Sequence, residues 1–215
     1  MKVKAAVVYE NADHPFTETR PLKIEEVDLD PPGPGEVLVK VMAAGLCHSD
    51  LSAIEGVRPR KMPYVPGHEA SGIVQEVGEG VTRVKPGDNA ILFFVPNCGT
   101  CTSCDRGEPY LCDTAYEARG DGSLITGEHK IRLNGEVINH TSGVSCYAEY
   151  MVLAEGSVIP IEKDIPLEDA ALFGCAVITG VGAVVNTAAV PPGATVAVLG
   201  LGGVGLNAMM AATLS

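Results

Sequence analysis

The sequence predicts an α/β chain in two parts, a mostly β domain followed by the truncated beginning of a doubly wound α/β domain. Short apolar runs alternate with glycine- and proline-rich turns as far as about residue 152, which is the pattern of a β domain. A continuous apolar run at residues 195–199 then precedes a glycine turn, and helical spacing resumes over residues 206–214. This order of strand, turn and helix is typical of the first unit of a parallel sheet covered by helices.

Each element of the β part is predicted from apolar runs bounded by turn residues. We expect strands at residues 3–9, 36–43, 71–77, 89–94 and 147–152. Between the first two strands, residues 28–35 contain three prolines and predict a turn region that is not helical. Asn134-Gly135 is a strong turn dipeptide and predicts a hairpin over residues 129–140.

The second part is predicted to be helical before its strand. Residues 167–173 have the composition of a short helix, and residues 179–189 are rich in alanine and valine and predict a buried helix. Pro191-Pro192-Gly193 ends that helix. The strand at 195–199 is expected to be buried on both faces, as in a parallel sheet.

The composition limits the partners that the chain can have. Its 215 residues carry a net charge of -12 at pH 7, which disfavours nucleic acid and anionic membranes as partners. The sequence has no uninterrupted apolar run of roughly 18 residues to span a membrane, and its N-terminus is too short for a secretory signal. Seven cysteines are an odd number, and reduced metal-binding thiolates fit a cytoplasmic protein.

Four cysteines lie close together in one segment. Two residues separate the first and second, two separate the second and third, and seven separate the last pair (Cys98, Cys101, Cys104 and Cys112). A tetrahedral metal needs four soft donors about 2.3 Å from one point, and two-residue gaps let neighbouring thiolates converge on it. The prolines and glycines of the segment supply the bends. The segment, residues 96–113, therefore predicts a closed structural Zn²⁺ site.

Three further ligand-type residues are far apart in the sequence. Cys47 follows a predicted strand, His68 precedes another, and Cys175 lies before the glycine turn. Catalytic zinc sites keep three protein ligands and leave the fourth position to water or substrate, so these residues fit a Cys₂His catalytic site. The alternative is two buried cysteines and a hydrogen-bonded histidine, which long-range spacing does not exclude.

The glycine turn has the pattern Gly200-x-Gly202-x-x-Gly205, with Gly203 and Val204 inside it. In a dinucleotide-binding unit the first glycine permits the tight turn, the second lets a pyrophosphate approach, and the third lets the helix pack on the strand. The alternative is a plain glycine turn in a βα unit. The acidic residue that distinguishes NAD from NADP would lie about 20 residues further on, past Ser215.

The sequence resembles the zinc-dependent alcohol dehydrogenases of the medium-chain dehydrogenase/reductase superfamily in the order and spacing of four motifs. These are Gly67-His68-Glu69, the four-cysteine segment, Gly174-Cys175 and the turn at Gly200. Residues 159–205 look closest to the branch that includes glutathione-dependent formaldehyde dehydrogenases.

The resemblance implies a fold and a reaction. The fold is a GroES-like catalytic domain at residues 1–176 followed by an incomplete Rossmann domain at residues 177–215. The reaction is reversible oxidation of an alcohol to an aldehyde or ketone, with hydride transfer to NAD, or to NADP, through a zinc-bound alkoxide. The resemblance also implies two zinc ions per chain, one catalytic and one structural, and a homodimer or homotetramer.

Residue roles follow from the same resemblance. The catalytic zinc ligands would be Cys47, His68 and Cys175, and the structural ligands Cys98, Cys101, Cys104 and Cys112. Ser49 matches the residue that receives the alcohol proton, Asp50 the carboxylate that orients the ligand histidine, and Glu69 the acidic residue behind the zinc. From the residues alone, Ser49 has an alternative role as the cap of a turn beside Asp50.

Further positions match the cofactor and substrate sites of the family. His48 matches a contact of the cofactor pyrophosphate, Thr179 a residue near the nicotinamide, and Phe94 one that lines the substrate pocket. Two positions depart from the pattern. Ser52 stands where many relatives have the histidine that ends the proton relay, so the relay would end in water or buffer. Ser142 replaces a large apolar residue and indicates a roomier pocket for a primary, aromatic or longer-chain alcohol.

The remaining ligand-type residues are interpreted as structural: His129 and His140 as surface or turn histidines, and Cys146 as a buried free thiol. Because the chain stops inside a predicted helix, it looks like the front part of a longer protein. An alternative function is therefore a zinc-binding fragment that is inactive because it cannot hold a complete cofactor. A zinc-free quinone-reductase-like relative is a third possibility, against which the seven ligand residues argue. We expect such a chain to associate, aggregate or fray after about Pro166.

Overall fold

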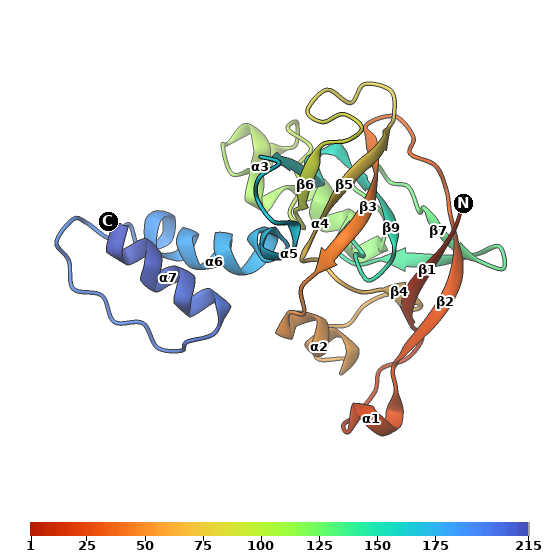
Figure 1. Ribbon diagram of the computed structural model, residues 1–215, viewed down its shortest axis with the longest axis horizontal. Helices are drawn as coiled ribbons and strands as arrows, with labels where there is room; N and C mark the ends of the chain where they lie inside the picture. The colour runs from red at the N-terminus through yellow and green to blue at the C-terminus, as the bar shows by residue number, and fades with distance from the viewer. Residues whose placement is uncertain (215) are drawn as a thin grey trace.

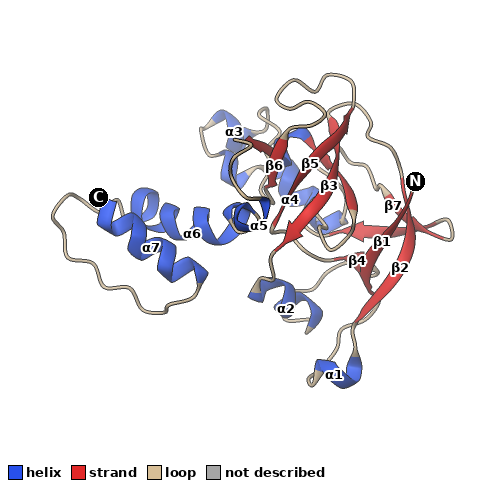
Figure 2. Cartoon of the chain, viewed as in Figure 1, coloured by secondary structure: helices blue, strands red, loops and turns tan. Residues whose placement is uncertain are grey.

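The computed structural model describes residues 1–214, and strands are the main secondary structure of the chain as far as Ile161 (Figures 1 and 2). Within this described range, five strands form a closed barrel in the order β1 (Lys2–Val8), β2 (Leu22–Leu29), β7 (Ile131–Leu133), β8 (Glu136–His140) and β4 (Tyr64–Val65). A second sheet has the order β10 (Val158–Ile161), β6 (Asn89–Leu92), β5 (Ala70–Val77), β3 (Glu36–Ala44) and β9 (Tyr150–Ala154).

One hydrophobic core is shared by the barrel and the second sheet. Val7 and Leu29 contribute from the barrel, and Val39, Leu92 and Leu153 from the sheet, and all five are almost fully buried. Successive residues of a strand point to opposite faces, so Val37 and Val39 of β3 enter this core together. Burial of each such side chain stabilises the fold by about 1.5–3 kcal/mol.

The predicted strands at residues 3–9, 36–43, 71–77, 89–94 and 147–152 are confirmed as β1, β3, β5, β6 and β9, with ends displaced by a few residues. The predicted hairpin is also confirmed, because β7 and β8 pair across Asn134 and Gly135, whose φ angles are 54° and 88°. The sequence pattern does not predict β2. Its residues 22–26 carry three charged side chains and are largely exposed, and pairing with β1 holds the strand in place.

Short helices connect the strands. They are α1 (Phe16–Thr19), α2 (His48–Ile54), α3 (Thr102–Asp105), α4 (Asp113–Asp121) and the 3₁₀ turns η1 (Pro109–Leu111) and η2 (Glu155–Ser157). Helices α3 and α4 form the lobe that carries the four-cysteine segment (Figure 1).

A single helical run, Leu167–Thr187, begins the C-terminal part. It comprises α5 (Leu167–Ala170), η3 (Phe173–Val177), α6 (Ile178–Gly182) and η4 (Ala183–Thr187), of which η3 and η4 are π-helical. Helix α7 (Gly203–Leu214) packs along it, and the two project together from the strands (Figure 1). By length and a mean hydropathy of 1.8 the run is apolar enough to cross a membrane. Its first turn packs on β3 and β5, and 28% of its most apolar stretch is buried.

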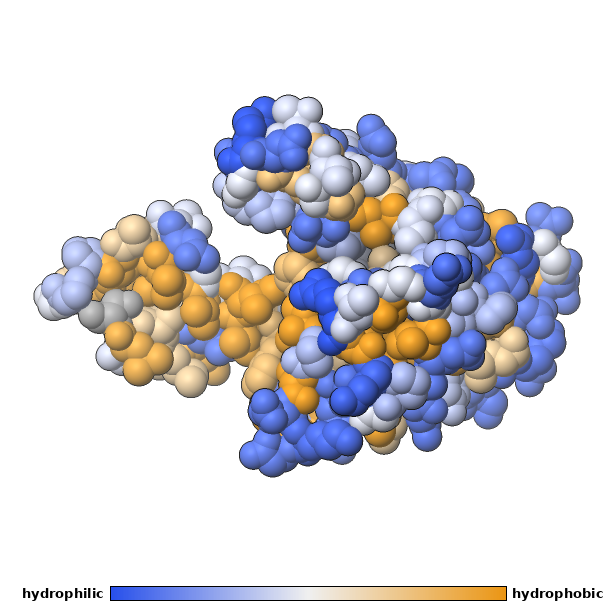
Figure 3. All heavy atoms as spheres, turned by 90° about the horizontal axis from the view of Figure 1, so that it is seen from above, coloured by the Kyte–Doolittle hydropathy of each residue, from blue (hydrophilic) through white to orange (hydrophobic). Residues whose placement is uncertain are grey.

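Two expectations for this part are wrong. Residues 195–199 do not form a buried strand but an exposed loop, in which Leu199 is 94% exposed. A strand needs a neighbour for its backbone hydrogen bonds, and within residues 1–214 none lies beside this segment. The helix at 179–189 forms, but Val181 and Val185 are exposed rather than buried. Residues 167–214 form an arm that projects from the strands, and Figure 3 shows apolar atoms over much of this arm.

The expectation that His140 is a surface or turn histidine is wrong. It is the last residue of β8 and 3% exposed, and its Nε2 accepts a hydrogen bond from the Lys130 backbone N–H at 3.2 Å. Burial, followed by the charges of His129 and Lys130, lowers its pKa to about 3, so the ring is neutral. His129 is partly exposed and lies 3.1 Å from Asp121, and Cys146 is a buried thiol, both as expected.

Candidate functional site

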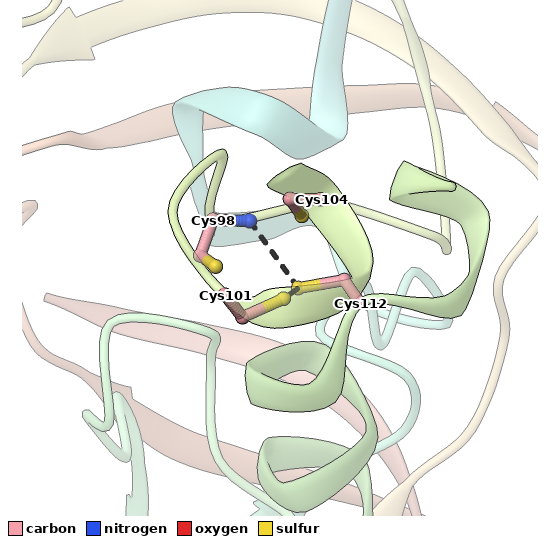
Figure 4. A group of neighbouring side chains, drawn as sticks. All are labelled: Cys98, Cys101, Cys104 and Cys112. Atoms are coloured by element: carbon pink, nitrogen blue, oxygen red, sulfur yellow. Dashed lines mark hydrogen bonds between the residues drawn. The ribbon is translucent and has the colours of Figure 1, made fainter. Parts of the chain in front are cut away.

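The four cysteines of the lobe converge. The sulfur atoms of Cys98, Cys101, Cys104 and Cys112 all lie within 4.8 Å of one another, and no disulfide joins cysteines of the described chain (Figure 4). The Cys98 N–H donates to Cys112 Sγ at 3.3 Å and the Thr100 N–H to Cys98 Sγ at 3.5 Å. These donors stabilise thiolates, so the group fits a tetrahedral zinc ion.

The acidities of the lobe thiols support the same fit. Hydrogen bonds from Thr114 and from the Thr100 amide lower the pKa of Cys98 to about 5. Loss of hydration and contact with Cys101 raise the pKa of Cys104 to about 12. Four thiols this close do not all ionise at neutral pH unless a cation compensates their charge, as a bound metal does.

A second group of ligand-type side chains comes together from three parts of the chain. One ligand atom from each of Cys47, His68, Glu69 and Cys175 lies within 4.8 Å of the other three. Cys47 precedes α2, and His68 and Glu69 precede β5. The pairing of β3 with β5 ends at Ala44 and Ala70, which brings these two segments side by side.

Cys175 reaches this group through a close helix contact. Gly174 of η3 lies against the backbone carbonyl of Leu92 at the end of β6, and a Cβ atom at position 174 would collide with that carbonyl. Only glycine permits this approach. The structure therefore brings Cys47, His68 and Cys175 together, and the order and spacing of the motifs around them were the sequence signal for this group.

The carboxylate of Asp50 organises the group. Its Oδ1 accepts hydrogen bonds from His68 Nδ1 at 3.1 Å and from Gly67 N–H at 3.2 Å. Its Oδ2 accepts from the Tyr147 hydroxyl at 3.1 Å and from Cys47 N–H at 3.3 Å. With Nδ1 held as the donor, His68 Nε2 is left free to bind a metal.

Tyr147 is a site residue that the sequence analysis missed. Its hydroxyl contacts Asp50 and also the Gly45 carbonyl at 3.1 Å. Burial and the nearby Asp50 charge raise its pKa well above the usual range, so the hydroxyl remains a donor. In the sequence Tyr147 only begins a predicted strand, and no local pattern links it to Asp50.

The electrostatics of the group favour a positive charge. Burial alone would lower the pKa of His68, but hydrogen bonds to Asp50 and Cys175 outweigh it and raise the pKa to about 10. A divalent cation satisfies the same acceptors. Ser49 Oγ lies 3.2 Å from Cys47 Sγ and 3.3 Å from His68 Nε2, where a group bound to that cation would meet its hydroxyl.

A cavity of about 280 Å³ opens beside this group and is called the substrate-side cavity below. Ser49, His68 and Cys175 line it together with three residues predicted for the substrate and nicotinamide (Phe94, Ser142 and Thr179). The Phe94 ring stands edge-on to the His68 ring, with centroids 5.0 Å apart. The structure thus brings these predicted residues to one space.

A second cavity, of about 740 Å³, lies along the glycine turn and is called the turn-side cavity. His48 lines it with the predicted turn residues Gly200, Gly202, Gly203, Val204 and Gly205. A Cβ at Gly205 would collide with the Gly200 carbonyl, whereas Gly202 faces open space. Both cavities are lined by Cys47, Cys175 and Val204, so they meet at the metal-ligand group.

Comparisons with known proteins agree with this arrangement. The family described as "Alcohol dehydrogenase GroES-like domain" matches residues 33–163. The chain is 43% identical over 213 residues to a putative alcohol dehydrogenase D of Mycobacterium tuberculosis and 44% identical to S-(hydroxymethyl)glutathione dehydrogenase of Escherichia coli. Each match covers 99% of this chain and 56% of the relative, so the chain spans about half the length of these curated relatives.

Solved structures show the same likeness. A zinc-binding alcohol dehydrogenase domain protein of Burkholderia ambifaria superposes with a TM-score of 0.89 at 35% identity. Benzyl alcohol dehydrogenase of Acinetobacter calcoaceticus superposes with a TM-score of 0.87 at 32% identity. Both matches cover 100% of this chain and 56% of the other. The strand-rich α/β fold and the family match together place this chain in the zinc-dependent alcohol dehydrogenases of the medium-chain dehydrogenase/reductase superfamily, with their GroES-like domain.

Proposed function

We propose that the chain is the N-terminal part of a zinc-dependent alcohol dehydrogenase that transfers hydride between a small alcohol and NAD. The observation that carries the proposal is that two cavities meet at Cys47 and Cys175, which lie in one group of ligand-type side chains with His68. One cavity has the size and lining for a small substrate, and the other follows a glycine turn. NADP stays an alternative.

In this proposal Cys47, His68 and Cys175 hold a catalytic zinc, and the four lobe cysteines hold a structural zinc. A zinc ion at the first site supplies a Lewis acid that makes a substrate hydroxyl more acidic. Asp50 holds His68 in the tautomer that leaves Nε2 free. Glu69, buried in the same group, adds a negative charge behind the metal.

The chain's own side chains then guide the proton and the two reactants. Ser49 Oγ accepts the proton of the substrate hydroxyl, since it lies beside His68 Nε2. Ser49 must pass a proton on in turn; Ser52 contacts His48 Nδ1 at 3.3 Å on the exposed side of α2, and a proton that reaches this pair would pass to solvent. Phe94 and Ser142 bound the substrate, and Thr179 lies where the nicotinamide would enter.

The cofactor is held on the turn side. His48 and the N-terminus of α7 offer donors to a pyrophosphate, and Gly202 leaves room for it. We place the end of the catalytic domain at residue 176, inside the run Leu167–Thr187, and the start of a Rossmann domain at residue 177. A cytoplasmic homodimer or homotetramer is part of the proposal.

The second candidate is a zinc-binding chain without activity. It is favoured by the exposed loop at residues 195–199, because a nucleotide-binding sheet needs a strand there. Both candidates keep the structural zinc, and they differ in whether the cofactor side is complete.

Zinc content tests the proposal. Elemental analysis of the purified chain is expected to give about two zinc ions, and Cys175→Ser about one, because one ligand of the open site is lost. Cys146→Ala, which removes a buried thiol outside both groups, is the matched control and should keep two. One zinc in the unmodified chain, unchanged by Cys175→Ser, would sink the catalytic assignment.

A further inference from the structure

Three arginines line the substrate-side cavity. Arg58 and Arg60 lie between α2 and β4, and Arg119 lies in α4, so two distant parts of the chain supply the charge. None of the ion pairs formed by residues 1–214 includes any of the three. This concentration of unpaired positive charge contrasts with the net charge of -12 of the whole chain.

Several polar atoms of the cavity wall have no partner. Arg60 Nε and Arg119 Nε are shielded from solvent and make no hydrogen bond to any described residue. Two other lining residues contribute the Tyr64 hydroxyl and Thr141 Oγ1, which are also buried and also make no hydrogen bond to a described residue. Buried polar groups in native proteins are nearly always paired, so their gathering around one cavity points to a ligand that pairs them.

The acidic residues near this wall are engaged elsewhere. Asp50 already accepts four hydrogen bonds, and Asp121 contacts Lys61 and His129. Burial, and then repulsion by Arg119 and Arg58, lowers the pKa of Arg60, although Tyr64 and Asp50 partly offset this. The guanidinium groups are therefore close enough to repel one another, and an anion between them would relieve that repulsion.

We propose that the substrate-side cavity takes an alcohol or aldehyde whose far end carries a carboxylate, bound by Arg60 and Arg119. A planar guanidinium matches a carboxylate in a bidentate pair, and the Tyr64 hydroxyl is a further donor. The cofactor phosphates are not the anion, because no arginine lines the turn-side cavity in the described chain, where the glycine turn and His48 lie. The inference rests on the proposed function, since it treats this cavity as the substrate site.

Calorimetric titration tests the subsite without turnover. Benzoate and 4-(hydroxymethyl)benzoate are each titrated into the zinc-loaded protein, with benzyl alcohol as the neutral partner. We expect the two carboxylates to bind at least about tenfold more tightly than benzyl alcohol, and Arg60→Gln and Arg119→Gln each to abolish that difference. Arg60→Lys keeps the positive charge but loses the planar guanidinium that makes the bidentate pair, so this variant should retain part of the preference for carboxylates.

Lys61→Gln is the matched control, because Lys61 is a neighbouring cation that pairs with Asp121 outside the cavity. It should leave the preference for carboxylates unchanged. Equal affinity for the charged and neutral ligands, or an equal loss in Lys61→Gln, overturns the subsite. Circular dichroism checks that each variant folds. If Arg60→Gln does not fold, the comparison is made with Arg119→Gln alone.

Oxidation of the two alcohols with NAD separates this inference from the proposed function. Turnover of benzyl alcohol with no preference for 4-(hydroxymethyl)benzoate keeps the dehydrogenase proposal and overturns the carboxylate subsite. Benzoate binding that depends on Arg60 and Arg119, without turnover of either alcohol, supports the subsite and counts against the proposed activity of this chain.

Discussion

Replacement of Asp50 by asparagine would remove one negative charge and one acceptor oxygen while keeping the size of the side chain. Oδ1 serves His68 and Gly67, and Oδ2 serves Cys47 and Tyr147. If the asparagine keeps its carbonyl at the Oδ1 position, its NH₂ group faces the Cys47 N–H. That part-buried amide then loses its acceptor, whereas the Tyr147 hydroxyl can turn and accept.

The magnitude follows from this count. A buried donor without a partner costs about 1–3 kcal/mol, and because the Cys47 N–H is part-buried, the free energy of unfolding of the zinc-free chain should fall by about 1 kcal/mol. Loss of a carboxylate behind a ligand histidine weakens metal binding by about 10–100-fold. Urea unfolding with a chelator present measures the first effect, and competition with a chromogenic chelator measures the second.

Tyr147→Phe is the control, because it removes one donor and keeps the carboxylate. We expect it to lower the free energy of unfolding by about 1 kcal/mol and to change the zinc affinity less than Asp50→Asn does. An Asp50→Asn chain that binds its second zinc as tightly as the unmodified chain would refute the argument that Asp50 orients His68.

Three further outcomes are expected. The folded pKa of His140, about 3, lies below its ordinary value of 6.5, so stability present above pH 6.5 is lost as pH falls. Urea unfolding at pH 7.5 and 5.5 should show this loss, up to about 1.4 kcal/mol per pH unit, and His140→Gln should not. Gly174→Ala should lower the free energy of unfolding by about 1–3 kcal/mol and lose one zinc, because its Cβ would collide with the Leu92 carbonyl. Gly182→Ala, whose Cβ would make only an ordinary contact with Asn186, should keep both zinc ions. Sedimentation should show association of the exposed apolar arm, and a monodisperse monomer resistant to protease after Pro166 would contradict this.

Local features of this protein were predictable because the interacting residues are neighbours in the chain. The cysteines of the lobe are joined by gaps of two and seven residues, so residue type and spacing suffice to bring them together. The Asn134-Gly135 hairpin depends on two φ angles that few residues other than asparagine and glycine adopt easily. The glycine turn before α7 was predictable for the same reason, because its glycines are separated by only a few residues in the chain.

Other features needed neighbours that the sequence does not reveal. Residues 195–199 have the composition of a buried strand, but a strand forms only against a partner, and none lies beside them within residues 1–214. His140 looked like a surface histidine, because its enclosure by distant segments leaves no trace in its own surroundings in the chain.

The sequence by itself determined the residue types of both metal-ligand groups, most strands of the β domain and the position of the glycine turn. Only the tertiary structure decided that Cys47, His68 and Cys175 meet where two cavities join, that Tyr147 supports Asp50, and that unpaired arginines line the substrate side. The reason is that spacing controls contacts within a few residues, whereas contacts between residues far apart in the sequence depend on how strands pair and on where a glycine lets two backbones touch.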